Sequence, residues 1–326
     1  MPGKPNRRRL GLAAAAFLLH LTLPPLAQAQ AWLPPQGEGS VSVGVQELYV
    51  PYHLRFDGSA GPKANGDIRI HSMAVDATYG VSEKLAIDLA LPRYIASRYG
   101  GVKPEGPRDD GKYYATFQDL HLGLRYAIRQ RGLALTPSVA VVLPSHGYET
   151  FGHVSPGRDL RELGLGFSAG RSLAPVLPET YVHAHYVYAI VEGVTHEGLD
   201  LSLNRSNTEL EVGHLLTRAL SIRGFGAWQH TYGGIEWTEE NLALHHEIHD
   251  LAARAILFRL GGGAAYALNP SIEVFGAVLT TMSGRNTHKA GGVMFGTSWT
   301  FGRPGTTGPV SPALSPRIAR PPSRRF

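Results

Sequence analysis

The sequence predicts an all-β fold, an antiparallel transmembrane β-barrel of about twelve strands with short periplasmic turns and long extracellular loops. Three observations support this prediction. Apolar and polar residues alternate with a period of two in one segment after another. The connections between these segments are alternately short and long. The chain also begins with a stretch that is typical of exported proteins.

Residues 1–29 are expected to be a signal peptide. Lys4 and three arginines from Arg7 onward give it a positive start, and Leu10–Leu23 is an apolar run that is short for a membrane helix. Ala27-Gln28-Ala29 fits a cleavage site, so the mature chain would begin at Gln30 and be exported by a Gram-negative bacterium. Because the chain has no cysteine, it uses no disulfide after export.

Period-two alternation is clearest in residues 84–95, where Leu85, Ile87 and Leu89 share one face while Asp88 lies on the other. Three glycines at 261–263 interrupt another segment and suggest a β-bulge there. The twelve expected strands lie near residues 39–50, 67–79, 84–95, 115–128, 133–143, 160–172, 179–190, 205–217, 219–232, 250–266, 271–281 and 292–301.

Loop lengths decide between barrel types. The connections near residues 80–83, 129–132, 173–178, 218 and 268–270 are short, whereas those near 51–66, 96–114, 144–158, 191–204, 233–249 and 282–290 are long. A soluble sandwich or lipocalin-like barrel has no reason to sort its turns in this way. A membrane barrel does, and in hydrocarbon only a closed barrel can satisfy every backbone amide. An even strand number also places the first and the last residue of the barrel on the same, periplasmic, side.

Aromatic residues fall where interface girdles are expected. Tyr79, Tyr126, Tyr266, Trp299 and Phe301 lie at proposed periplasmic ends of strands, and Tyr49, Tyr94, Trp228 and Tyr232 lie at outer ends.

The barrel is expected to span residues 39–301, and the segments before and after it have different compositions. Residues 30–38 contain Trp32 and Pro34-Pro35 and form an N-terminal segment that is a candidate plug. Residues 302–326 hold six prolines and no alternating pattern, so we expect a disordered Pro/Arg-rich tail.

The net charge of +5 is misleading about partners. Four basic residues lie in the signal peptide and five lie after Phe301, so residues 30–301 carry 22 basic groups against 26 acidic ones. A nucleic-acid-binding protein would need a basic face on its folded part. We therefore expect no nucleic-acid partner.

The inward faces of the expected strands carry charges of both signs. Such a set can brace a wet interior through ion pairs, or it can form a constriction that orients a small solute. The residues expected to line the lumen and contact solute are Asp76, Asp88, Asp119, His121, Arg125, Glu162, His183, His185, Glu209, Glu211, Arg223, Arg259 and Glu273.

The 15 histidines raise the question of metal binding or catalysis. His245-His246-x-x-His249 has a spacing that suits a metal only on a helix, and His183-x-His185 fits a polar strand face better than a metal site. His214 is expected to face lipid near a strand end. The sequence contains no Gly-x-Ser-x-Gly elbow that would place a catalytic serine. We predict no catalytic residue, no metal and no cofactor.

Two stretches resemble a known family. Thr78-Tyr79-Gly80-Val81-Ser82-Glu83-Lys84-Leu85, continuing through Leu91-Pro92, is similar to the turn-and-strand unit of the MetA-pathway phenol-degradation family of outer-membrane transporters. Phe117-Gln118-Asp119-Leu120 with Gly123-Leu124-Arg125-Tyr126 resembles the next strand of that family. The similarity covers about residues 40–145 and implies an outer-membrane β-barrel that takes up small aromatic or hydrophobic solutes.

These observations predict a channel or transporter for small solutes in the bacterial outer membrane. Two other functions stay open: a barrel hydrolase that acts on lipid or peptide, and a closed barrel that serves as an adhesin or scaffold. The expected partners are outer-membrane lipids, a small-molecule solute and the barrel-assembly machinery.

Overall fold

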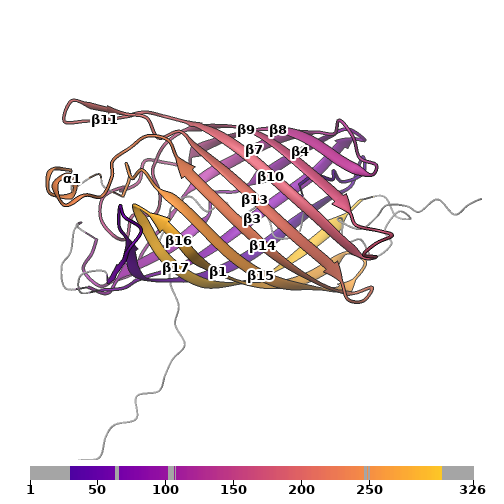
Figure 1. The fold of residues 1–326 in the computed structure, drawn as a ribbon. Helices are drawn as coiled ribbons and strands as arrows, with labels where there is room; N and C mark the ends of the chain where they lie inside the picture. Colours follow the sequence, from indigo (N-terminus) through magenta and orange to yellow (C-terminus); the bar gives the residue numbers. More distant parts are fainter. Residues whose placement is uncertain are drawn as a thin grey trace, which may run out of the picture.

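The fold is a single antiparallel sheet rolled into a barrel (Figure 1). The computed structural model describes residues 30–62, 66–101, 106, 108–245, 248 and 250–302. The expected signal peptide and the expected tail from residue 303 onward lie outside the described residues. The elements are β1 (Gly39–Leu54), β2 (Ala60–Pro62), β3 (Ile68–Ser82), β4 (Leu85–Ala90), β5 (Tyr94–Tyr99), β6 (Tyr114–Phe117), β7 (Asp119–Tyr126), β8 (Leu133–Pro144), β9 (Glu162–Ser172), β10 (Thr180–Val191), β11 (Val194–His196), β12 (Leu199–Leu201), β13 (Arg205–Leu215), β14 (Leu220–Thr231), α1 (Glu239–Leu244), β15 (Ile256–Asn269), β16 (Ile272–Arg285) and β17 (Thr287–Phe301).

The first and last strands close the barrel. β1 pairs with β17 from Gly39 opposite Phe301 to Leu54 opposite Thr287, and its other edge pairs with β3. Every long strand therefore has a neighbour on both sides around the ring. The predicted fold class, a closed antiparallel transmembrane barrel of twelve spanning strands, is confirmed.

Alternation in the sequence becomes inside and outside in the wall. On β7, Leu122, Leu124 and Tyr126 are exposed on the outer surface, whereas Arg125 points inward and is buried. The predicted girdle tyrosines and tryptophans are likewise exposed. The exterior is thus apolar where hydrocarbon would contact it.

Two of the twelve membrane-spanning strands are each interrupted and form two shorter strands. The expected strand 84–95 is β4 followed by β5, with Leu91-Pro92-Arg93 between them, and the expected strand 115–128 is β6 followed by β7, with Gln118 between them. Both parts of the first interrupted strand, β4 and β5, still pair with β3. Proline supplies no amide hydrogen to the ladder, which explains the break at Pro92.

One predicted loop is wrong. Residues 282–290 were expected to form a long extracellular loop, but β16 runs to Arg285 and β17 begins at Thr287. Asn286 alone makes the turn, with φ of 50°, a left-handed conformation that asparagine adopts more readily than most residues. The strand expected from residue 250 also begins later, at Ile256.

The bulge predicted at Gly261–Gly263 is also wrong. These glycines pair regularly with Leu279, Val278 and Ala277. A Cβ at Gly261 would collide with the ring of Phe225 on the neighbouring strand, so the glycine leaves room for an inward aromatic side chain. The irregularities in this pair of strands lie instead between Phe258 and Arg259 and near Asn269.

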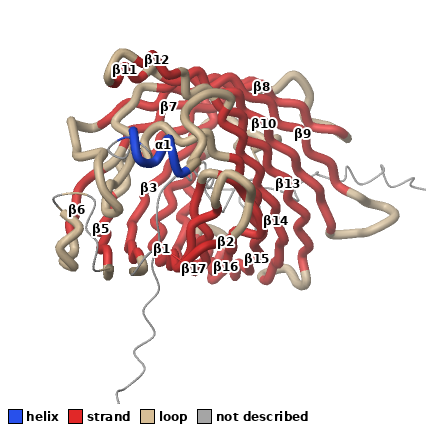
Figure 2. The backbone as a smooth tube through the Cα atoms, turned by 60° about the vertical axis from the view of Figure 1, so that its left-hand side comes forward, coloured by secondary structure: helices blue, strands red, loops and turns tan. Residues whose placement is uncertain are grey.

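The long connections gather at the extracellular end. β2 extends the sheet beside β1, β11 and β12 form a small separate hairpin, and α1 lies in the connection between β14 and β15. Figure 2 shows α1 and the β11–β12 hairpin at the same end of the barrel. Within the described parts of the chain, no helix is long and apolar enough to cross a membrane.

Substitution on the lipid-facing surface tests the inside–outside assignment. Val278 lies at mid-height on β16 and is 59% exposed, while Leu268 lies near the β15–β16 turn and is 58% exposed. We expect Val278→Arg to lower the free energy of unfolding by about 2–4 kcal/mol in lipid vesicles, because the charge enters the bilayer midplane. Leu268→Arg should cost less than about 1 kcal/mol, since it sits at the interface. Equal losses in urea titrations of the two variants would contradict the assignment.

Candidate functional site

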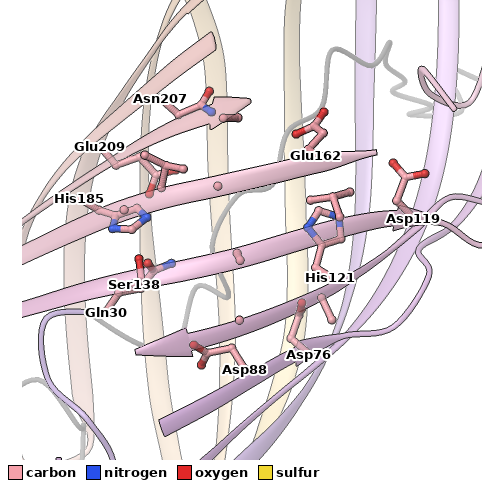
Figure 3. A pocket seen from close by; sticks show the side chains of 18 of the residues that line it. Gln30, Asp76, Asp88, Asp119, His121, Ser138, Glu162, His185, Asn207 and Glu209 are labelled. Carbon is pink, nitrogen blue, oxygen red and sulfur yellow. The ribbon is translucent and has the colours of Figure 1, made fainter. Parts of the chain in front are cut away.

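A cavity of about 270 Å³ lies inside the barrel. Its wall is formed by residues of β3, β4, β7, β8, β9, β10, β13, β14 and β15, joined by Gln30 from the N-terminal segment. Figure 3 shows the polar side chains spread over successive strands, from Asn207 and Glu209 on β13 to Asp88 on β4 and Asp76 on β3. This volume is near the lower limit of small-molecule pockets in proteins.

Most of the residues predicted to line the lumen meet at this cavity. The nine that line it are Asp76, Asp88, Asp119, His121, Arg125, Glu162, His185, Glu209 and Arg259. The other four, His183, Glu211, Arg223 and Glu273, share the inward parity of their strands but lie nearer the periplasmic end. There Glu211 accepts a hydrogen bond from Tyr181 and lies 3.8 Å from Arg223.

The acidic side chains on β3, β4 and β7 are matched by cations or donors. Arg125 Nε and Nη2 donate to the two carboxylate oxygens of Asp88 at 2.6 and 2.7 Å, a bidentate ion pair, and Thr78 Oγ1 also donates to Asp88. Asp76 lies within electrostatic range of Arg93. The acidic groups on this side of the cavity are therefore stabilised by ion pairs and hydrogen bonds within the wall.

The N-terminal segment enters the barrel from the periplasmic end. Arg125 Nη1 donates to the backbone carbonyls of Gln30 and Trp32 at 3.1 and 3.3 Å, and Thr136 Oγ1 donates to that of Ala31 at 2.7 Å. The Trp32 ring meets Tyr181 edge-on at 6.1 Å.

Its contacts cross the lumen. The segment leaves β1, whereas Tyr181 lies on β10, on the far side of the ring of strands. A Cβ at Gly170 would collide with the Trp32 ring, so glycine there makes space for the indole. Residues 30–32 thus lie in the lumen, and Gln30 lines the cavity.

An extracellular loop, residues 145–161, contacts the cavity wall at its outer end through Asp119 and Gln118. Tyr148 Oη donates to Asp119 at 2.6 Å and accepts from the backbone amide of Asp159 at 3.0 Å. Burial, and then the negative charge of Asp119, raises the pKa of Tyr148, so its hydroxyl stays protonated and remains a donor. Gln118 also donates to the carbonyl of Pro156.

The same loop is anchored further along by His153. Its ring nitrogen Nδ1 forms a hydrogen bond of 2.9 Å with a carboxylate oxygen of Asp109. The ring also stacks on Tyr99, with ring centres 4.1 Å apart. His153 and Asp109 are both buried. Residues 145–161, which we call the outer roof, are therefore fixed by buried polar and aromatic contacts.

Sequence reasoning missed several cavity residues. Arg205, Asn207 and Gln229 line the cavity and have the same parity as predicted residues on their strands, so alternation could have found them. Arg93 could not be found in this way, because the break at Pro92 interrupts the alternation.

The histidines give little support for metal or catalytic chemistry. Of the 245–249 motif only His245 is described, since His246 and His249 lie outside the described residues. Among the described residues, no group of three or more His, Asp or Glu side chains is arranged to hold a metal ion. His214, expected to face lipid, hydrogen bonds to Thr180 at 2.9 Å.

One serine–histidine pair does occur inside the barrel. Ser168 Oγ lies 2.7 Å from His185 Nδ1. Ser168 is fully buried, however, and Asp88 is engaged by Arg125 and Thr78. The pair therefore lacks an accessible nucleophile.

Comparison with known proteins agrees on the fold. The COG4313 outer membrane channel from Pseudomonas putida F1 superposes with a TM-score of 0.64 at 10% identity, over 84% of this chain and 99% of that one. This likeness shows a shared fold, a β-barrel of the outer-membrane type. The NanC porin and the CymD monoaromatic hydrocarbon channel give TM-scores of only 0.47 and 0.42, at 9% and 10% identity. They cover 79% and 83% of this chain, and 98% and 90% of their own.

The likeness to the COG4313 channel supports the predicted outer-membrane β-barrel at the level of fold. No protein-family model matches the sequence, and neither does any curated protein. The closed wall and apolar exterior place the chain in the bacterial outer membrane.

The Tyr148 hydroxyl offers a test of the outer roof. Tyr148→Phe removes both of its hydrogen bonds, and we expect local opening of residues 145–161 to become easier by about 1–3 kcal/mol. Hydrogen exchange of the Asp159 amide should then quicken roughly 10- to 100-fold. Tyr113→Phe is the matched control, because the Tyr113 hydroxyl contacts only exposed His71 among the described groups. Unchanged exchange in the Tyr148 variant would show that the roof is held elsewhere.

Proposed function

We propose that this chain is an outer-membrane channel for small apolar or amphipathic solutes. The observation that carries the proposal is a cavity enclosed by a closed barrel at mid-height, between an inner segment and an outer loop. The likeness to an outer membrane channel supports it. Outer-membrane lipids around the apolar belt and the barrel-assembly machinery complete the proposed set of partners.

The chemistry of the wall supports a mixed solute. Val142, Val187 and Leu257 bring apolar surface to the cavity, while carboxylates, guanidinium groups and amides bring polar atoms. A small solute with an apolar body can pack on the former and hydrogen bond to the latter.

Within this proposal, residues 30–38 are a plug that must move before solute passes. The segment crosses the inner end of the cavity and buries Ala31. Residues 30–33 are held by hydrogen bonds between side chains and their backbone and by one ring contact, whereas Gly37 and Glu38 make backbone hydrogen bonds to Gly80. Such a segment opens at lower cost than a strand.

Two other functions have weaker support. A barrel hydrolase would depend on the buried Ser168–His185 pair, which reaches no accessible substrate position. An adhesin or scaffold would present its outer loops to a partner, but the described roof loop is folded inward over the cavity.

Planar-bilayer conductance tests the channel and its plug together. Deleting residues 30–36, or replacing Trp32 by Ala, should raise the single-channel conductance several-fold, because the inner end of the lumen opens. Trp299→Ala is the control, since that indole is 55% exposed on the outer surface. The channel proposal fails if neither the intact protein nor the deletion variant passes ions or small solutes. The plug alone fails if the deletion variant conducts no better than the intact protein.

A further inference from the structure

One sector of the cavity wall has hydrogen-bond donors that nothing in the described structure satisfies. Among the described residues, the cavity-lining side chains with buried, unpartnered N–H groups are Arg205 at Nε and Nη1, Gln229 at Nε2 and Arg259 at Nε. Each of these three side chains is at least nine-tenths buried. A buried donor without a partner costs free energy comparable to a lost hydrogen bond, so these N–H groups are available to an acceptor that enters the cavity.

These donors are neighbours. They lie on the three successive strands β13, β14 and β15. Gln229 is opposite Asn207 on one side and Leu257 on the other, which puts Arg205 and Arg259 at its two diagonal positions. Diagonal neighbours of this kind lie about 7–8 Å apart, within reach of long side chains.

A further guanidinium stands behind this sector. Arg158, from the outer loop, is 3% exposed, and none of its three guanidinium nitrogens has a hydrogen-bond partner among the described residues. Burial and the nearby Arg205 lower the pKa of Arg158 to about 9, so it remains a cation at neutral pH. Glu162 compensates Arg205 through a 2.5 Å contact, but Arg259 has no carboxylate within ion-pair distance among the described residues.

The opposite wall differs. In the ring of twelve spanning strands, the side opposite β13, β14 and β15 is formed by β3, β4 and β7. Their carboxylates Asp76, Asp88 and Asp119 already interact with Arg93, Arg125 and Tyr148. The two walls thus present a satisfied acidic side and a side with spare donors.

We propose that the sector formed by Arg205, Gln229 and Arg259 is a binding subsite for the carboxylate of an amphipathic solute. This subsite rests on the proposed channel function and narrows its solute class. A guanidinium donates in a planar fork that matches a carboxylate. Val187 and Ala189 on β10 adjoin Asn207 and Arg205 in the register, so an apolar body can pack beside the charged group.

Glu209 sets the limit on affinity. It lies in the same register row as Arg259, with Ala227 between them, and forms no ion pair with it among the described residues. In its ionised form, the Glu209 carboxylate opposes a bound carboxylate. Removing that charge should therefore strengthen binding, whereas removing Arg259 should weaken it.

Calorimetric titration of the intact, detergent-solubilised protein with benzoate and with benzyl alcohol tests the subsite. Benzoate should bind about tenfold more tightly than the neutral alcohol, and Arg259→Gln should abolish that preference, as expected for one charge-assisted hydrogen bond. Glu209→Gln should increase benzoate affinity. Arg161→Gln, which removes the same charge from a side chain that is 74% exposed, should leave it unchanged.

The proposal is overturned if benzoate and benzyl alcohol bind equally, or if Arg259→Gln has no effect in a variant with native far-UV circular dichroism. It is also overturned if Arg161→Gln weakens benzoate binding as much as Arg259→Gln, because net charge alone would then explain the preference. These measurements need no transport, so their failure leaves the conductance test of the channel untouched.

Discussion

The backbone hydrogen bonds between β1 and β17 are the constraint on which the rest of the structure depends. In hydrocarbon an open sheet edge would leave a row of unsatisfied amides, each costing several kcal/mol. Closure removes both edges at once. It also locks the register, because a shift of one residue at any seam would turn the inward carboxylates toward lipid. The polar lumen and the apolar exterior are therefore one consequence of a single closed ladder.

A cavity persists in this barrel because its waist is lined with small residues. Twelve strands enclose more space than the eight of a barrel filled by side chains, and Ala74, Ala140, Gly164 and Gly166 add little volume at the cavity wall. Toward the periplasmic end, Trp32 and Tyr181 occupy the lumen instead. The free volume therefore lies at the level of these small residues, above the Trp32–Tyr181 contact.

Parity could be read from the sequence, but partners could not. Alternation predicts an inward direction for Asp88 and Arg125, because side-chain direction repeats every second residue, and both line the cavity. That Arg125 also holds the carbonyls of Gln30 and Trp32 depends on the register between β4 and β7 and on the path of a segment outside the barrel ladder. Neither leaves a local signal. The turn at Asn286 and the glycines at 261–263 were misjudged for a related reason, since packing across strands, not local composition, decided their conformation.

The hydrogen bonds at the two ends of the chamber indicate which end opens at lower cost. If residues 30–33 leave, Arg125 loses its two longer bonds, at 3.1 and 3.3 Å, and Thr136 and Gln130 lose their bonds to the segment. Arg125 keeps its bidentate pair with Asp88. No charge is then left unpaired at that position. If the outer roof lifts, the buried contact of His153 with Asp109 must break, and Val154 must leave an apolar cluster that includes Tyr99 and Ile95. Separating a buried charged or polar pair costs more than exchanging a carbonyl contact for water. Opening at the periplasmic end is therefore the cheaper movement, while the roof and the wall keep the chamber in shape.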